Sequence, residues 1–335
     1  MGEPTFATLG CFGKLPIHAD FIGYRAAAPE VQALDQWFQE GILAARSRLG
    51  RGWESDFLKS PPWRFVFYTA GTASFLTGVA IPSRDQSGRC YPFFLFLKVE
   101  RKRFSFPLWF APVVYAGFLG EATSFAWSAW QGAQEGVRER MTARVFLDRL
   151  ERTPFTVPGA EEIAPVEEAY RRMLETKRVR DFLEALFGAF EDRRKYLLDQ
   201  RLGEIVEMRG SRFPAGWGVR FPLFPCDSGP GYDVPFWFDL VGRWTAPITA
   251  DPVFFWSRSN GLENGSAAGG ALLAFFGPPS PKGFLSLIRP DLDNDACYDL
   301  VPRTSDPGSG VATGRRPLLE EGELSLAAWL NRIGS

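Results

Sequence analysis

The core of the fold is set by W-R-F-V-F-Y-T at residues 63–69, F-L-T-G-V-A-I at residues 75–81 and Y-P-F-F-L-F-L-K-V at residues 91–99. Each run has the length of a β-strand, is rich in aromatic and β-branched residues, and is bounded by Gly or Pro. Strands with such near-continuous apolar character are typical of a sheet that is covered on both faces. The three runs therefore predict three strands of a layered α/β core.

The segments before these runs add a strand and a helix. Residues 5–12 predict a first strand, which Gly13 and Pro16 terminate. Pro29 suits the first position of a helix, and apolar residues then recur at helical spacing until Gly50. This part of the chain predicts an amphipathic helix of about five turns.

The middle of the chain is helical in character and rich in charge. Residues 122–132 and 138–152 predict helices, and the periodic residues 161–201 predict a helical insertion between two parts of the sheet. Residues 213–235 are dense in Gly and Pro and predict a long loop that contains one short strand.

The end of the chain returns to strand-like and helical patterns. Strands are expected at residues 252–256 and 271–277, and helices at residues 281–288 and 324–333. The order of elements predicts an α/β fold, a three-layer sandwich around a mixed sheet with a helical insertion in the middle; a division into two lobes stays open. Three regions are expected. Residues 1–135 form an N-terminal region and residues 136–212 form the insertion. Residues 213–335 form a C-terminal region that completes the core or forms a second lobe.

Composition narrows the class of protein. Lys plus Arg total 38 against 39 Asp plus Glu, whereas binding to nucleic-acid phosphates normally needs a basic excess, so no nucleic-acid partner is expected.

The four cysteines are scattered without a C-x-x-C pair, which is typical of reduced thiols in a cytosolic chain. The first residues lack the basic start and apolar run of a signal peptide, so we expect a cytoplasmic protein. The 31 Phe and 11 Trp either fill a large core or include an exposed patch for a partner.

One stretch could be read as a membrane segment. Residues 104–120 carry no charge and follow the basic residues 101–103. The stretch is shorter than the roughly 20 residues that a spanning helix needs, and Pro107 and Pro112 interrupt it. We expect a buried strand, turn and helix here, and no membrane insertion.

A single histidine restricts the chemistry available to the chain. His18 is the only one, so a nucleophile–histidine pair would have to use it, and a multi-histidine metal site is excluded. The sequence also lacks a complete phosphate-binding loop, a dinucleotide fingerprint and a G-x-S-x-G nucleophile elbow. A carboxylate-only site, such as that of a metal-dependent phosphatase, stays open, but the sequence gives no positive case for catalysis. We predict no enzymatic activity, no cofactor and no bound metal.

Several short motifs together resemble one family. They are G-C-F-G-K-L-P-I-H-A-D-F-I at residues 10–22, P-P-W-R-F at residues 61–65 and I-P-S-R-D-Q-S-G-R-C-Y-P at residues 81–92. Their content and order resemble the N-terminal signature of the TagF (ImpM) family, proteins of bacterial type VI secretion systems. L-D-Q-W-F at residues 34–38 is similar to the tryptophan-bearing first helix of that family. Ala19 departs from the pattern, which usually has glycine there. Such a change either strains a turn that needs a positive φ or indicates a slightly different backbone.

The resemblance implies a regulatory function. TagF-like proteins are expected to be post-translational repressors that act through a forkhead-associated scaffold protein of the secretion apparatus. Some relatives carry a phosphatase module, whose metal-binding Asp-Gly pairs this sequence lacks. We therefore expect a cytoplasmic accessory protein that works by binding. The alternatives are a hydrolase that uses Asp20, His18 and Lys14, or a membrane-associated assembly component.

The candidate partner-binding or signature residues follow from these motifs: Gly13, Lys14, Pro16, Asp20, Phe21, Trp63, Arg64, Ser83, Asp85, Gly88 and Arg89. The charged members lie at loop edges beside apolar strands. They either pair with one another and fix the loops, or form a polar surface rimmed by aromatic residues that a partner recognises. Asp85 and Gly88 also suit a tight reversal, in which Arg89 could bind loop carbonyls.

Overall fold

The computed structural model describes residues 7–104, 107–134, 141–157, 160–209, 213–214, 216–225, 231–245, 252–258, 270–292, 294–301 and 321–334. Within them lies a nine-stranded sheet of order β2-β1-β5-β4-β3-β7-β8-β6-β9, in which β6 and β9 are parallel and the other neighbours antiparallel. The strands are β1 Ala7–Gly13, β2 Ile22–Tyr24, β3 Trp63–Phe67, β4 Ser74–Ile81, β5 Phe93–Glu100, β6 Gly218–Pro222, β7 Val253–Ser257, β8 Ala271–Phe275 and β9 Cys297–Asp299.

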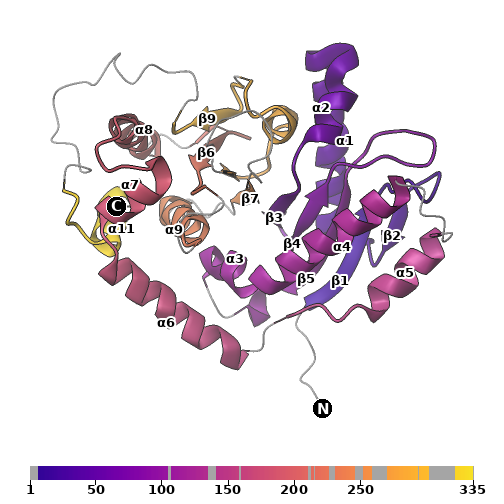
Figure 1. Cartoon of the computed structure of the whole chain (residues 1–335), viewed down its shortest axis with the longest axis horizontal. Helices are drawn as coiled ribbons and strands as arrows, with labels where there is room; N and C mark the ends of the chain where they lie inside the picture. The colour runs from indigo at the N-terminus through magenta and orange to yellow at the C-terminus, as the bar shows by residue number, and fades with distance from the viewer. Residues whose placement is uncertain are drawn as a thin grey trace.

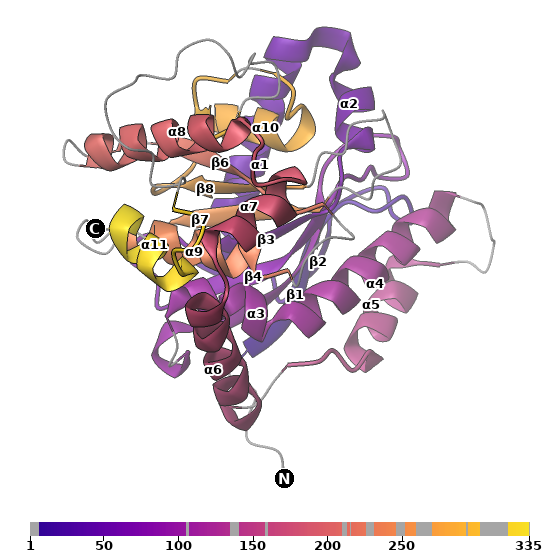
Figure 2. The same cartoon turned by 60° about the vertical axis from the view of Figure 1, so that its left-hand side comes forward.

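Helices cover both faces of this sheet (Figures 1 and 2). One face carries α1, α2, the turn η5 and α10, and the other carries α3, α4, α5 and α9. The helices are α1 Pro29–Leu49, α2 Trp53–Lys59, α3 Ala111–Val114, α4 Ala116–Gln134, α5 Ala143–Arg152, α6 Ala160–Thr176, α7 Val179–Phe187, α8 Arg194–Arg209, α9 Asp233–Thr245, α10 Leu285–Ile288 and α11 Leu326–Gly334, with short 3-10 turns at η1 Gly50–Gly52, η2 Arg101–Arg103, η3 Leu108–Phe110 and η5 Pro281–Phe284. The expected three-layer α/β sandwich is confirmed.

The apolar strands explain this layering. In β5, Leu95 and Leu97 face the α4 side, whereas Phe94 and Phe96 face the α1 side. Successive side chains of a strand point to opposite faces, so a run without polar positions needs cover on both. The same sheet continues into the C-terminal part of the chain, because β3 pairs with β7 through Phe65 and Phe255 among others.

The first helix follows its sequence signals closely. The structure begins α1 at Pro29 and ends it at Leu49, and the following Gly50 has φ +61°, a positive φ that glycine adopts without strain. α1 packs across the sheet through Trp37, whose indole N–H donates to the Ser280 carbonyl at 3.0 Å.

Some expectations for the middle and end of the chain were wrong. The loop expected at residues 213–235 contains β6 but ends earlier, because α9 begins at Asp233 and admits Pro235 in its first turn, where no helical N–H is lost. Residues 234–241 of α9 are all buried, so the helix has no polar stripe to give it a period. The short elements α2 and β9 were also not predicted.

The uncharged stretch at residues 104–120 contains no strand in its described part. Leu108–Phe110 forms a 3-10 turn, and α3 and the start of α4 follow. Pro112 lies in the first turn of α3, where proline is tolerated. None of the helices among the described residues is both long and apolar enough to cross a membrane.

The Trp63 indole fixes one helical layer to the sheet and provides a first prediction. Its N–H donates to the carbonyl oxygen of Leu287 in α10, at 3.0 Å, and the side chain is buried. Trp63→Phe keeps most of the ring but leaves a buried carbonyl without its donor, so we expect a loss of about 1–3 kcal/mol in the free energy of unfolding.

Chemical denaturation of the purified protein measures this loss. The matched control is Trp53→Phe, because Trp53 is equally buried but instead packs its ring against Phe57 and under Arg46. Equal destabilisation by the two substitutions would show that ring volume, rather than the hydrogen bond to Leu287, determines the effect.

Candidate functional site

Two loops that carry the sequence motifs leave the sheet side by side. The first, residues 14–21, follows β1, and the second, residues 82–92, joins β4 to β5. Gly13 at the end of β1 lies opposite Phe93 at the start of β5, and Phe93 also lies opposite Ile81 at the end of β4. The antiparallel register therefore brings both loops to the same edge of the sheet.

Glycine is required at the point where the first loop leaves β1. Gly13 has φ +132°, and a Cβ at this position would lie 2.1 Å from the carbonyl oxygen of Pro92. Any other residue would clash with the backbone of the second loop. The G-K dipeptide of the motif therefore reflects close packing of the two loops.

Hydrogen bonds then join the loops directly. The main-chain N–H of Gln86 donates to the carbonyl of His18 at 2.9 Å, and the Arg89 guanidinium donates to the carbonyl of Ala19. The expectation that Arg89 binds a loop carbonyl is confirmed. Ala19 adopts no positive φ, so its departure from the family pattern causes no backbone strain.

The buried carboxylate of Asp85 lies at the centre of this arrangement. One of its oxygens accepts from Lys14 Nζ at 2.9 Å and from Arg89 Nε at 2.7 Å, and the other accepts from the main-chain N–H groups of Ser87 and Arg89, each at 2.9 Å. Burial alone would raise the pKa of Asp85, but the hydrogen bonds from Lys14 and Arg89 outweigh it and lower the pKa to about 2. Asp85 is therefore ionised at neutral pH and fixes both loops.

An exposed aromatic ring lies directly above this ion pair. Phe21 is 38% exposed, yet its ring stacks on Phe12 at 5.2 Å between centroids and meets the edge of Tyr91 at 4.9 Å. Lys14 Nζ lies 4.9 Å from the centroid of the Phe21 ring. Tyr91 in turn donates from its hydroxyl to Asp35 of α1. The exposed ring is thus held in place from several sides.

The outer residues of the two loops form what we call the paired-loop surface, residues 18–21 and 86–89, all of which are exposed. Asp20 contributes a negative charge, although one of its oxygens accepts from the Phe21 N–H at 2.8 Å. The Arg89 side chain is 59% exposed and contributes a positive charge. The surface thus combines a fixed aromatic ring with opposite charges close by.

The predicted site residues divide into three groups. The first group is exposed on the paired-loop surface: Asp20, Phe21, Gly88 and Arg89. The second group lies beneath that surface and is buried, except for the half-buried Pro16: Gly13, Lys14, Pro16, Ser83 and Asp85. The third group lies in β3: Trp63 and Arg64. The structure brings the first two groups together, and the pairing of Lys14, Asp85 and Arg89 is confirmed.

The third group lies apart from the loops. β5 and β4 separate β3 from β1, and Trp63 is a buried side chain that fixes α10 to the sheet. Trp63, one of the candidate partner-binding or signature residues, therefore lies away from the paired-loop surface. The P-P-W-R-F motif marks a packing contact between layers, because a large aromatic residue at a strand start can reach the helix above.

Sequence reasoning missed the supports of the exposed ring. Phe12 and Tyr91 hold Phe21, and Asp35 holds Tyr91. Tyr91 lies inside a quoted motif, but its role depends on the sheet register, which the motif does not specify. The described residues contain no cluster of three metal-ligating side chains.

Comparisons with known proteins place this region in a family. Residues 10–153 match the model of the TagF N-terminal domain, described as type VI secretion system-associated. A search of curated proteins finds no significant match. Among solved structures, the crystal structure of PA0076 from Pseudomonas aeruginosa PAO1 is similar with a TM-score of 0.48 and 17% identity, over 85% of this chain and 96% of that chain. That similarity is too distant to support an argument. The family match covers both loops: residues 10–153 of this chain carry a TagF N-terminal domain, which is a type VI secretion system-associated domain.

Proposed function

We propose that the protein is a non-enzymatic, cytoplasmic accessory protein that represses a type VI secretion system after translation. It does so by binding a forkhead-associated scaffold protein of the apparatus through the paired-loop surface. The observation that carries the proposal is the exposed but immobilised ring of Phe21.

Such a ring is suited to protein recognition. Binding energy in protein interfaces concentrates in a few large side chains, which a polar rim surrounds. Phe21 is fixed by Phe12, Tyr91 and Lys14 before any partner arrives, so little side-chain entropy remains to be lost on binding. Asp20 and Arg89 provide charges at the rim, where they can orient a partner.

The hydrolase alternative has weaker support in the geometry. Lys14 is paired with Asp85, and Asp20 accepts a hydrogen bond from the main chain of its neighbour. The His18 side chain is exposed, and its loop is joined to the second loop through the His18 carbonyl. These partners favour a binding surface over a catalytic arrangement of Asp20, His18 and Lys14.

A substitution of His18 separates the two functions. We expect His18→Ala to leave repression of secretion unchanged, because the imidazole is exposed and the loops are held by main-chain and Asp85 contacts. The measurement is the amount of a secreted type VI substrate in a strain whose own gene is replaced by the variant. Loss of repression by a variant whose melting temperature and scaffold binding are both unchanged would favour the hydrolase.

Co-purification tests the partner itself. The tagged full-length protein is isolated from cells with an active secretion system, and the recovered proteins are identified by mass spectrometry. Recovery of the forkhead-associated scaffold supports the proposal. Absence of the scaffold from all preparations would contradict the proposal. Fractionation of the protein with membranes would also contradict it and would favour the membrane-associated alternative.

A further inference from the structure

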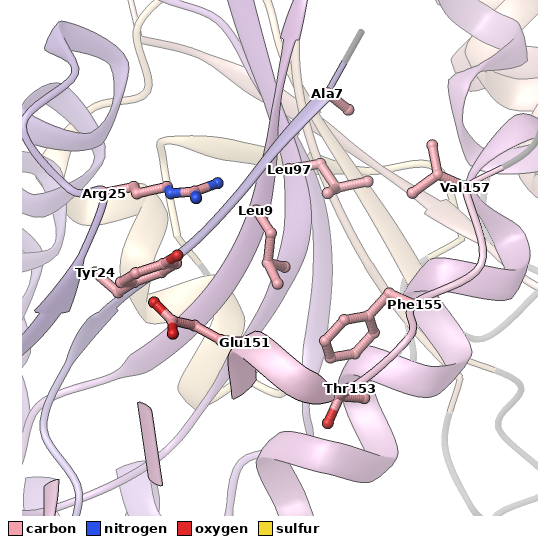
Figure 3. A pocket seen from close by; sticks show the side chains of 9 residues that line it. All are labelled: Ala7, Leu9, Tyr24, Arg25, Leu97, Glu151, Thr153, Phe155 and Val157. Atoms are coloured by element: carbon pink, nitrogen blue, oxygen red, sulfur yellow. The ribbon is translucent and has the colours of Figure 1, made fainter. Parts of the chain in front are cut away.

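A cavity of about 510 Å³ lies on the α5 side of the sheet, and none of its lining residues belongs to the paired-loop surface. Leu9 of β1 and Leu97 of β5 form its floor, and Phe155 and Val157 of the segment after α5 form one wall (Figure 3). Tyr24, Arg25 and Glu151 form the opposite side. The volume lies within the roughly 300–1,000 Å³ of typical small-ligand sites.

The polar side presents two opposite charges. The Tyr24 hydroxyl hydrogen-bonds to the Glu151 carboxylate, and this bond raises the pKa of Tyr24, so the hydroxyl remains a donor at neutral pH. Arg25 belongs to the cavity lining, and its guanidinium lies 4.9 Å from the centroid of the Tyr24 ring (Figure 3). Among the described residues, no carboxylate lies within ion-pair distance of Arg25.

The backbone of Arg25 is strained. Its φ of +50° makes it the one described residue other than glycine in the left-handed region. A non-glycine residue in that region is destabilised, and such strain concentrates at ligand-binding sites. In this conformation the guanidinium lies beside the Tyr24 ring in the cavity lining.

The apolar wall is fixed before any ligand binds. The Phe155 ring packs against Phe118 and Phe125 of α4, with centroids 5.6 and 5.7 Å away. Next to it, the main-chain N–H and the hydroxyl of Thr156 donate to the Glu121 carboxylate at 2.7 and 2.6 Å. A rigid wall reduces the entropy lost on binding.

We propose that this cavity binds an α-amino acid with a large apolar side chain. The carboxylate pairs with Arg25, the ammonium group pairs with Glu151, and the side chain packs against Leu9, Leu97 and Phe155. The site carries one charge of each sign beside an apolar floor, which a zwitterion with an apolar tail complements and a singly charged ligand does not.

Calorimetric titration of the full-length protein with L-phenylalanine and L-leucine tests the proposal. We expect dissociation constants in the millimolar range or tighter for at least one of the two. 3-Phenylpropionate lacks the ammonium group and phenethylamine lacks the carboxylate, and each is expected to bind at least about ten-fold more weakly than L-phenylalanine. Equal binding of either analogue, or no binding of both amino acids, would overturn the proposal.

Substitutions of Arg25 provide the second arm. Arg25→Gln is expected to weaken L-phenylalanine binding by at least about ten-fold, whereas Arg48→Gln, an exposed arginine on α1, leaves it unchanged. Arg25→Gly removes the side chain but accepts the left-handed backbone, so it should lose binding while the melting temperature stays equal or rises. Undiminished binding by both Arg25 variants would contradict the assignment.

Discussion

Replacing Asp85 with asparagine is expected to lower the free energy of unfolding by about 3–5 kcal/mol. The substitution leaves the Lys14 ammonium group buried without a counter-charge, 2.9 Å from an amide that cannot compensate it. It also weakens the bonds that hold Arg89 and Ser87. Urea denaturation followed by tryptophan fluorescence measures the loss.

Two variants distinguish the ion pair from general damage to the loop. Asp20→Asn changes an exposed carboxylate in the same region and should alter stability by no more than about 0.5 kcal/mol. The double variant Lys14→Met with Asp85→Asn should recover part of the loss, because the unpaired charge is gone. A cost below about 1 kcal/mol for Asp85→Asn alone would mean that solvent reaches Lys14 and the pair is not buried.

The same carboxylate sets a dependence on pH. The pKa of Asp85 is lowered from 3.8 to about 2 in the folded protein, so the ionised form stabilises the fold above pH 3.8. This contribution declines as the pH falls from 3.8 toward about 2, where folded Asp85 takes up its proton. The stability difference between wild type and Asp85→Asn should therefore be constant at neutral pH and narrow over that window. A difference that persists unchanged at the lower end would contradict the assignment.

Replacing Phe21 with alanine is expected to weaken binding of the proposed partner, the forkhead-associated scaffold, by about 30-fold or more. This is the effect of losing a central hot-spot residue worth about 2 kcal/mol. Stability should fall by only about 1–2 kcal/mol, since the ring is partly exposed and loses contacts with Phe12 and Tyr91. Titration of purified components gives the affinity, and thermal denaturation gives the stability.

The matched control for Phe21 is Leu43. This side chain is 63% exposed on α1, so Leu43→Ala removes a comparable exposed apolar group outside the paired-loop surface. Its binding is expected to equal that of wild type. Loss of affinity in both variants, or in the Leu43 variant alone, would move the interface away from the loops.

The sequence predicted the N-terminal part of the sheet and the first helix because their signals are local. Pro29 and Gly50 mark the ends of α1, and the apolar runs mark β3, β4 and β5. The α9 helix was not recognised, since burial on all sides removes the polar stripe and Pro235 suggests a loop. Strands as short as β9 depend on their neighbours for stability and have little signal of their own.

The candidate site was predictable in its residues but not in its arrangement. Lys14 and Asp85 were identified from motifs that lie 71 residues apart, and their contact follows from the pairing of β1 with β5. Trp63 belongs to another such motif and yet serves the core. A motif shows that a residue type matters, but it does not show where in the sheet the residue lies. Strand order and register depend on pairing between distant segments, which the motif does not specify.

Hydrogen–deuterium exchange of the full-length protein, with and without the proposed partner, the forkhead-associated scaffold, tests most directly whether the two loops form one binding surface. Peptides that cover residues 14–21 and 82–92 should both become protected on addition of the scaffold, while α8, on the far side of the sheet from α1, keeps its exchange rate. Protection of only one loop, or of neither while another region becomes protected, would contradict a single paired-loop surface.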